Sequence, residues 1–243
     1  MKALLLSDIH GNIDALLAVE EDLRRRQEHC DLVLVLGDLV DYGPAPDEVI
    51  AWVRCHAHHA VRGNHDHAMA TGADCRSSPA FQALSVATRE LFRPRLQPDS
   101  LAFLEALPTR LTLNIDGRTA VMVHATPRNP LFEYLRPDAP DETWSAALGD
   151  PAQGPDYVFL GHTHLPFVRR VGKAIVVNPG SLGQPKDGDP RGCYAVVEDD
   201  RVDPRRVSYD VERAVARLLA LGLDRRHAQM LAGILRSGGL SAA

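Results

Sequence analysis

Five short apolar runs, each ending at a group of polar residues, constrain the fold of this chain more than any other feature. The runs read as strands and cover 2–7, 32–36, 59–62, 119–124 and 157–161. In open α/β sheets, sites form outside the carboxyl ends of the strands, so we expect the polar groups to converge. These groups are Asp8-Ile9-His10, Gly37-Asp38-Leu39-Val40-Asp41, Gly63-Asn64-His65-Asp66, His124 and Gly161-His162-Thr163-His164.

The converging groups offer oxygen and imidazole ligands and no cysteine. That ligand set suits hard-to-borderline divalent ions such as Mn²⁺, Fe²⁺ and Zn²⁺. Residues i and i+2 of an extended chain point the same way, so Asp8 and His10 should aim at one point, and His162 and His164 likewise. Three glycines beside the polar groups would allow tight turns and close backbone approach. They are Gly37, Gly63 and Gly161.

Each of these residues has an ordinary structural alternative when it is taken alone. An aspartate at a strand–helix turn often caps the helix, His124 alone would more often be a satisfied core residue, and Asn64 alone would occupy a turn. Seven such polar residues would be costly to bury without partners, and metal coordination offsets that cost for all of them at once. The seven are Asp8, His10, Asp38, Asn64, His124, His162 and His164.

The order of the expected elements indicates an α/β fold. Helices at about 13–26, capped by Asn12, and at 46–56 separate the first three strands, and a helical insertion at about 67–108 follows. We expect one domain over 1–243, a four-layer αββα sandwich of two stacked mixed sheets flanked by helices, ending in a helical pair at about 211–236. Further helices are expected at 79–92, 99–107 and 140–148, and further strands at 110–115, 174–178, 193–198 and 207–209.

Composition narrows the classes of protein that the chain can belong to. Its 243 residues, 45% of them hydrophobic, fit one domain better than two. The net charge of −5 lacks the basic surplus of a dedicated nucleic-acid binder. The four cysteines form no Cys-x-x-Cys pair, and we expect free thiols. We find no signal peptide or membrane span in the sequence, so we expect a cytoplasmic protein that binds neither membranes nor stable nucleic-acid partners.

The polar groups, together with Asp-Tyr-Gly-Pro at 41–44 and Asn-Pro-Gly-Ser-Leu-Gly at 178–183, give the chain a specific resemblance. It resembles the calcineurin-like metallophosphoesterases, in the branch of small bacterial phosphodiesterases. The resemblance covers roughly the whole chain up to the C-terminal helices. It implies a metal-dependent phosphoric ester hydrolase with two divalent ions per chain, drawn from Mn²⁺, Fe²⁺ or Fe³⁺, Zn²⁺ and Ni²⁺, and a metal-bridging water or hydroxide as nucleophile.

The resemblance also implies a role for each ligand. One ion would be held by Asp8, His10 and His164, and the other by Asn64, His124 and His162. Asp38 would bridge the two ions.

Other residues would act on the substrate rather than on the metals. His65 would donate a proton to the leaving alkoxide or bind a phosphate oxygen, with Asp66 holding its ring from behind. Asp41 would more readily orient a metal-binding histidine than bind an ion itself. Arg128 and the helix start at Asn12 are candidate phosphate contacts. Lys186 and Arg191 lie in the loop 184–192, where the sequence does not distinguish substrate contacts from solvated side chains.

The leading function is hydrolysis of small organic phosphodiesters or monoesters, with nucleotides among the candidate substrates. The alternative of a protein Ser/Thr phosphatase is disfavoured by Tyr42 and Asp66, because those enzymes carry Arg and Glu at these two places. Hydrolysis of diadenosine polyphosphates stays open as an alternative function. A homo-oligomer formed through the leucine stripes of the C-terminal tail also stays open. A non-catalytic scaffold of the same fold would have lost metal ligands or the third-motif histidine, all of which are present. A DNA nuclease is disfavoured by the acidic charge balance.

Overall fold

The first of two sheets carries the N-terminal strands. In this computed structural model, which describes residues 1–149 and 154–239, it has five strands in the order β10-β9-β1-β2-β3. The pairs β1–β2 and β2–β3 are parallel, whereas β9 runs antiparallel to both β1 and β10, so the sheet is mixed. Its strands are β1 (Ala3–Leu6), β2 (Leu32–Val35), β3 (His59–Ala60), β9 (Gly192–Glu198) and β10 (Arg201–Val207).

The second sheet is also mixed and five-stranded, in the order β4-β5-β6-β8-β7. The central strands β5, β6 and β8 are parallel, and an antiparallel strand closes each edge. A hairpin turn at Asp116-Gly117 joins β4 to β5, with positive φ at both residues. The strands are β4 (Arg110–Ile115), β5 (Arg118–Val123), β6 (Tyr157–Phe159), β7 (Phe167–Val171) and β8 (Ala174–Asn178).

Eight helices flank the two sheets in the described part of the chain. Asn12 caps the first of them, as predicted, by accepting a hydrogen bond from Ala15 N. The helical pair predicted at the end of the chain is present, and Gly222 separates its members with φ +79°. The helices are α1 (Ile13–Arg25), α2 (Pro46–His56), α3 (Asn64–Thr71), α4 (Pro79–Phe92), α5 (Pro98–Ala106), α6 (Asp141–Leu148), α7 (Val211–Leu219) and α8 (Arg225–Ser237).

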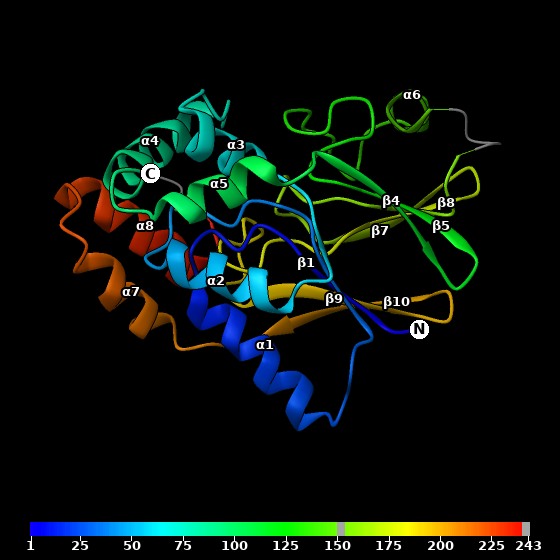
Figure 1. Cartoon of the computed structure of the whole chain (residues 1–243), viewed down its shortest axis with the longest axis horizontal. Helices are drawn as coiled ribbons and strands as arrows, with labels where there is room; N and C mark the ends of the chain where they lie inside the picture. The colour runs from blue at the N-terminus through cyan, green and yellow to red at the C-terminus, as the bar shows by residue number, and fades with distance from the viewer. Residues whose placement is uncertain (150–153, 240–243) are drawn as a thin grey trace.

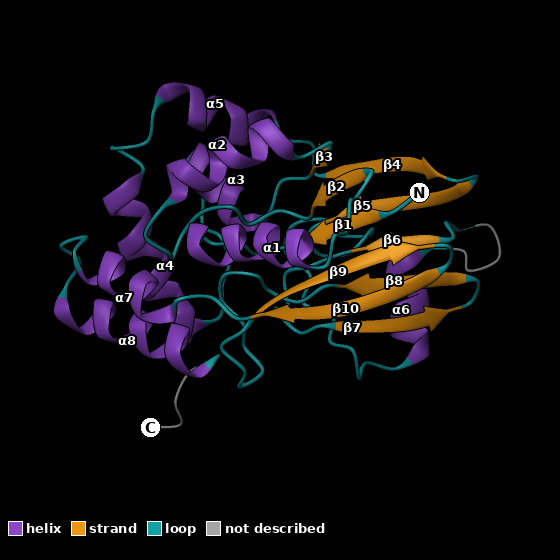
Figure 2. Cartoon of the chain, turned by 90° about the horizontal axis from the view of Figure 1, so that it is seen from below, coloured by secondary structure: helices purple, strands orange, loops and turns teal. Residues whose placement is uncertain are grey.

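The two faces of strand β1 show why the sheets stack. Leu4 and Leu6 belong to the core that packs under α1 and α2, whereas Leu5 belongs to the core between the sheets. On the far face of the second sheet, the fully buried Trp144 of α6 packs with Val158 and neighbouring strand residues. Figure 2 shows both sheets on one side of the molecule with α6 beside them. The predicted sandwich of two stacked mixed sheets flanked by helices is therefore confirmed.

Most helices gather at one end of the sheets. In Figure 1, α1–α5, α7 and α8 lie to the left and the hairpins of both sheets extend to the right. A hydrophobic cluster joins α4, α7 and α8, and it includes Tyr42 from the loop after β2. The helical insertion and the C-terminal pair thus cover the end of the sheets at which the parallel strands deliver their polar residues.

Three elements differ from the sequence prediction. Strand β7 and helix α3 were not expected, and β10 spans Arg201–Val207 where a strand was predicted at 207–209. Both strands lie at sheet edges and carry arginines, and β10 also contains Pro204, so neither shows an apolar run. Helix α3 has only eight residues and no apolar stripe, because its first turn belongs to the polar group at 63–66.

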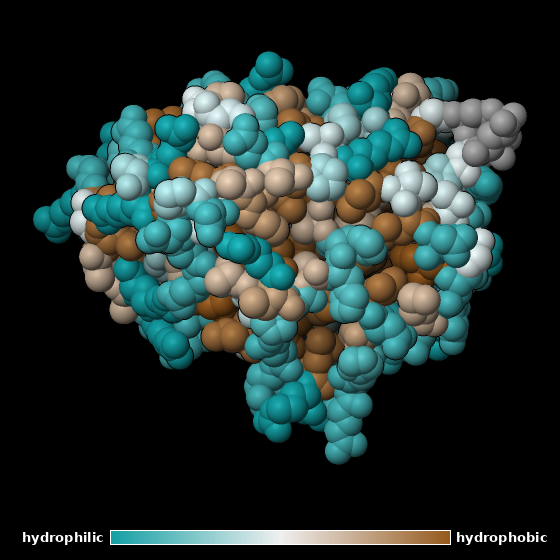
Figure 3. Space-filling view, viewed as in Figure 1, coloured by the Kyte–Doolittle hydropathy of each residue, from teal (hydrophilic) through white to brown (hydrophobic). Residues whose placement is uncertain are grey.

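The surface is largely hydrophilic where Figure 3 shows it, with apolar residues scattered between charged ones. Among the helices of the described residues, none combines the length and the apolar character needed to cross a membrane.

Candidate metal centre

The loops that follow β1, β2, β5 and β6, together with Asn64 at the start of α3, bring the seven predicted ligands to one place. The amide of Asp8 donates to Gly37 O at 3.0 Å, and Gly161 N donates to His124 O at 2.8 Å. A bond of 3.0 Å from Gly183 N to Asp8 O ties the loop after β8 to the same place. All seven side chains are buried, with residue exposures of 0% for Asp8, 1% for His10, 1% for Asp38, 0% for Asn64, 0% for His124, 2% for His162 and 2% for His164.

The backbone turns sharply at most of these ligands. Asp8, His10, Asp38, His162 and His164 all have left-handed φ values between +45° and +67°. Such a conformation costs a non-glycine residue about 1–2 kcal/mol, so the surrounding structure must hold it. The expectation that each pair points inward from an extended chain was therefore wrong: Asp8 with His10, and His162 with His164, lie in tight turns just past the strands.

Two of the predicted glycines stand where no side chain fits. A Cβ at Gly63 would overlap Oδ1 of Asp38, and a Cβ at Gly161 would overlap Oγ of Ser7 and lie 2.6 Å from Oδ2 of Asp8. Each glycine thus lets one loop lie directly against an aspartate of another loop, as the sequence predicted.

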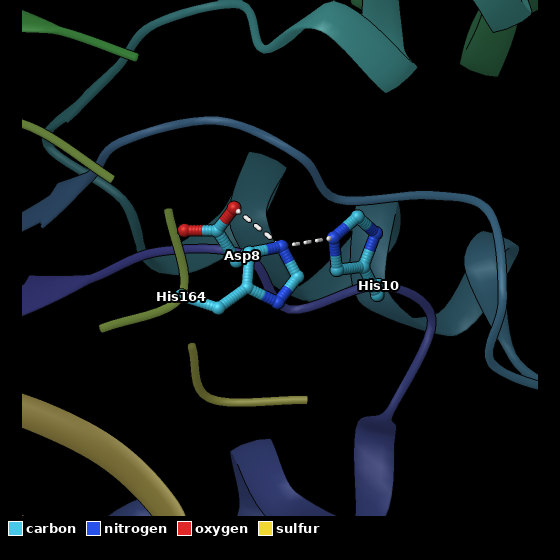
Figure 4. A group of neighbouring side chains, drawn as sticks. All are labelled: Asp8, His10 and His164. Carbon is cyan, nitrogen blue, oxygen red and sulfur yellow. Dashed lines mark hydrogen bonds and ion pairs between the residues drawn. The ribbon is translucent and has the colours of Figure 1, made fainter. Parts of the chain in front are cut away.

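Asp8, His10 and His164 form the first of two ligand groups. Nε2 of His164 lies 3.2 Å from Oδ1 of Asp8 and 3.3 Å from Nε2 of His10 (Figure 4). Nδ1 of His10 faces the carbonyl oxygen of Val40 at 2.7 Å, and Nδ1 of His164 faces that of Gln184 at 2.6 Å. A carbonyl only accepts, so each Nδ1 carries the proton and each Nε2 presents its lone pair to the other.

The second group consists of Asn64, His124 and His162. Nδ2 of Asn64 donates to Cys75 O at 2.7 Å, which points Oδ1 of the amide at Nε2 of His124 and Nδ1 of His162, each 3.0 Å away. Asp38 lies between the two groups, because its Oδ2 is 3.1 Å from Nε2 of His124 and 3.7 Å from Nε2 of His10.

This donor set fits divalent cations. Burial lowers the pKa values of His10, His162 and His164, which favours neutral rings with a free lone pair. Oδ1 of Asp8 is buried and has no hydrogen-bond partner among the described residues. Burial opposes a charge on His124, but Asp38 outweighs it and raises the pKa of that ring to about 9, so the site favours positive charge there. Lone pairs facing one another around two carboxylates are the arrangement that a bound cation satisfies.

His65 lies beside the first group, with its ring centroid 5.0 Å from that of His10, and its nitrogen lies close to ligand atoms of His10 and Asp38. Its Nδ1 is 2.7 Å from Oδ2 of Asp41, and its Nε2 is 3.4 Å from the hydroxyl of Tyr42. Burial alone would lower the pKa of His65, but the charge of Asp38 and the hydrogen bond to Asp41 raise it well above the ordinary value. Asp38 and Asp41 thus favour the doubly protonated ring, with one proton directed at Asp41.

Asp66 does not hold the ring of His65, contrary to the sequence prediction. Its carboxylate accepts hydrogen bonds from the amides of Gly63, Asp38 and Leu39 at 2.8–2.9 Å. The reason is its place in the first turn of α3, where the side chain folds back onto the start of the helix. Asp66 thus ties the second and third polar groups together, and Asp41 contacts the ring instead.

The two predicted phosphate contacts are engaged elsewhere. The amide group of Asn12 caps α1 and donates to Gly183 O at 3.1 Å. Arg128 forms an ion pair with Glu133 and has a half-exposed side chain. A phosphate contact at Arg128 or at the helix start after Asn12 stays a prediction.

Four residues around the centre were not foreseen or were left undecided. Cys75 lies within 4.8 Å of ligand atoms of Asp41 and His65, and Arg89 lies 3.6 Å from its sulfur and 3.8 Å from Oδ2 of Asp41. Burial would raise the pKa of the Cys75 thiol, but the hydrogen bond to His65 lowers it to about 6. The sequence analysis did not identify Cys75 and Arg89, because neither residue belongs to one of the polar motifs.

Tyr134 and Lys186 complete the surroundings. The ring of Tyr134, 46% exposed, lies over the ring of His162 with 3.8 Å between centroids. Nζ of Lys186 lies 3.4 Å from Nε2 of His164. Burial lowers the pKa of this lysine to about 8, which leaves most of it charged at neutral pH.

Comparison with known proteins agrees with this geometry. Residues 1–201 match the family model of the calcineurin-like phosphoesterase superfamily domain. The chain is 30% identical over 234 residues to the uncharacterised protein MJ0912 of Methanocaldococcus jannaschii, covering 88% of this chain and 90% of that protein. It is 28% identical over 210 residues to phosphodiesterase YfcE of Escherichia coli, covering 82% of this chain and 89% of that enzyme.

A solved structure extends the similarity to the fold. The metallophosphoesterase from Sphaerobacter thermophilus is 33% identical, with a TM-score of 0.77 over 98% of this chain and 99% of that one. Three findings point to the same family: the family model matches most of the sequence, a solved relative is 33% identical, and the centre could hold divalent metal ions. The chain therefore belongs to the calcineurin-like phosphoesterase superfamily and is a phosphoric ester hydrolase.

Proposed function

We propose that this enzyme hydrolyses small organic phosphodiesters or monoesters with two divalent ions. The observation that carries the proposal is the pair of ligand groups on either side of Asp38, whose lone pairs face inward. Asp8, His10 and His164 would hold one ion, Asn64, His124 and His162 the other, and Asp38 both. Two such ions would lower the pKa of a shared water and take up charge from the phosphoryl oxygens of an in-line displacement.

The protein's own side chains would do the remaining work. His65 holds one proton toward Asp41, and its second proton, at Nε2, would pass to the oxygen of the leaving group. Asp41 fixes the ring and favours its charged form. Because the centre is almost fully buried, attraction between fixed charges and the developing charge of the reaction would be weakly screened there.

The relatives support a diester as the first substrate class to test. YfcE, the relative in Escherichia coli, is named a phosphodiesterase. We propose small substrates because loops and helices of the described residues pack closely around the centre. The ring of Tyr134 also lies over that of His162. We also propose that residues 1–243 act as one domain, since Tyr42 beside the centre packs into the cluster that joins α4, α7 and α8.

A turnover assay tests the proposal. Purified protein stripped of metal would be assayed with bis-p-nitrophenyl phosphate and p-nitrophenyl phosphate while Mn²⁺, Zn²⁺, Ni²⁺ and Mg²⁺ are added back in turn. We expect hydrolysis that depends on added metal, and the ratio of diester to monoester turnover defines the substrate class. Absence of turnover with every metal, in protein shown to bind two ions, would favour a non-catalytic scaffold.

A further inference from the structure

Lys186 stands in a loop that is fixed on both sides of it. Gln184 accepts a hydrogen bond from Nδ1 of His164 at 2.6 Å, and its own amide donates to Oγ of Ser181 at 2.8 Å. On the other side, Asp187 forms an ion pair with Arg206 of strand β10. The backbone on both sides of Lys186 is therefore held beside the metal centre.

The ammonium of Lys186 lies against the ligand group formed by Asp8, His10 and His164. Its Nζ is 3.4 Å from Nε2 of His164 and 4.2 Å from the centroid of the Phe81 ring of α4. An aromatic face holds a cation without neutralising it. Packing against Phe81 thus helps to place the side chain, and the carboxylates of Asp8 and Asp38 attract it from further away.

The other lysines of this chain are paired with carboxylates, and Lys186 is not. Nζ of Lys2 lies 3.2 Å from Glu198, and Nζ of Lys173 lies 3.9 Å from Asp156. Within residues 1–149 and 154–239, no carboxylate oxygen lies within 4.0 Å of Nζ of Lys186. Arg191, in the same loop, is paired with a carboxylate too: its guanidinium lies 2.6 Å from Asp189.

A loaded centre would change the contact that Lys186 makes. An ion bound to Nε2 of His164 uses the lone pair that now faces the ammonium, and two positive charges at that distance repel. An anion between them removes the repulsion and gives the ammonium a hydrogen-bond acceptor. The anion that the proposed reaction brings to this place is the phosphoryl group of the substrate.

We propose that Lys186 binds a non-bridging oxygen of the substrate phosphoryl group on the side of Asp8, His10 and His164. The proposal rests on the proposed function for the nature of its ligand. One added positive charge attracts a phosphomonoester dianion, or released inorganic phosphate, more strongly than a diester monoanion. Lys186 is therefore a residue that tunes the selectivity of this enzyme between the two ester classes.

The test uses three variants of the full chain loaded with Mn²⁺. Lys186→Met keeps the length of the side chain without its charge, Lys186→Arg keeps the charge, and Lys173→Met removes a surface lysine as a control. Titration calorimetry measures the binding of inorganic phosphate, elemental analysis counts bound metal, and kcat/KM is measured for p-nitrophenyl phosphate and bis-p-nitrophenyl phosphate.

We expect Lys186→Met to bind phosphate about tenfold more weakly or worse, as for loss of one charged hydrogen bond, with unchanged metal content. Its kcat/KM should fall more for the monoester than for the diester. Lys186→Arg should stay within about threefold of wild type, since it keeps a charged donor. Lys173→Met should not differ from wild type.

Two results would overturn this role. One is phosphate affinity unchanged in Lys186→Met, and the other is loss of metal from both Lys186 variants, which would make the lysine a support of the metal centre. Phosphate binding is measured without turnover, so the two proposals fail separately. A protein that binds phosphate through Lys186 but hydrolyses neither ester would overturn only the proposed function.

Discussion

The charge of Asp38 and the hydrogen bond to Asp41 favour the charged form of the His65 ring. Asp41 contacts Nδ1 at 2.7 Å, and the amide of His65 donates to Oδ1 of Asp38 at 2.9 Å. In the proposed reaction, Nε2 of this ring would donate the proton to the leaving group. Removing the ring should therefore affect turnover and not metal binding.

We predict that His65→Ala lowers kcat by about 10²–10⁴-fold, the usual contribution of a positioned general acid. Metal content should stay at the wild-type value, as measured by elemental analysis after dialysis. Asp41→Asn serves as a matched variant that keeps the ring but weakens its charge, and we expect an intermediate loss of kcat. Unchanged kcat in His65→Ala would remove the acid role.

At this scale the sequence predicted which residues gather and not how each one points. The seven candidate ligands were identified by residue type and by their places at strand ends, and the structure brings all of them together. The partner of His65 was wrongly predicted, because Asp66 is its neighbour in sequence whereas Asp41 lies 24 positions before it. Asp66 turns back to the backbone because it lies in the first turn of α3. The sequence did not predict this helix, since α3 has no apolar stripe.

Turns between elements, more than the elements themselves, shape the centre. The loops after β1, β2 and β6 place ligands in left-handed conformations and pack against one another through glycines. Gly161 lies so close to Ser7 that any side chain would displace the loop that carries Asp8. Replacing this glycine should therefore lower both the metal affinity and the stability of the protein.

We predict that Gly161→Ala destabilises the protein by about 1–3 kcal/mol, the usual cost of overpacking, and lowers its metal content. Gly233→Ala is the matched control, since Gly233 lies within α8 with nothing within 4 Å of an added Cβ. That change should leave metal content intact and stabilise the helix by about 0.5–1 kcal/mol. Thermal unfolding and elemental analysis of both variants measure the difference. Equal behaviour of the two variants would contradict the proposed close approach.

Element boundaries followed the strength of the local pattern. Helices α2 and α4 and strand β8 have the predicted limits, because each combines a clear apolar pattern with a proline or a turn at its boundary. Strands β7 and β10 are edge strands with charged faces, so their pairing comes from neighbouring strands and not from their own pattern. Such segments become visible only when the order of the sheet is known.

The whole molecule keeps a cluster of polar side chains almost completely out of water. The seven candidate ligands are at most 2% exposed, and five of them have strained backbone conformations. Bound ions would satisfy the inward lone pairs only in the folded state. Metal binding should therefore stabilise the whole fold.

We predict that saturating Mn²⁺ raises the melting temperature of the metal-stripped protein by about 5–10 °C for each ion bound. At a free metal concentration of 100 times Kd, the linkage contributes about 2.7 kcal/mol, and each kcal/mol shifts Tm by about 2–4 °C in a protein of this size. Asp38→Asn should show a much smaller shift, because both ligand groups share this carboxylate. Scanning calorimetry of both proteins with and without Mn²⁺ measures the effect. A wild-type shift no larger than that of Asp38→Asn would contradict shared coordination.

The central claim is that Asp38 lies between two metal positions, and anomalous diffraction tests it most directly. Crystals grown with Mn²⁺ should give two anomalous peaks per chain. One should lie among Asp8, His10 and His164, the other among Asn64, His124 and His162, with Asp38 in contact with both. A single peak, or two peaks of which only one touches Asp38, would contradict the dinuclear account.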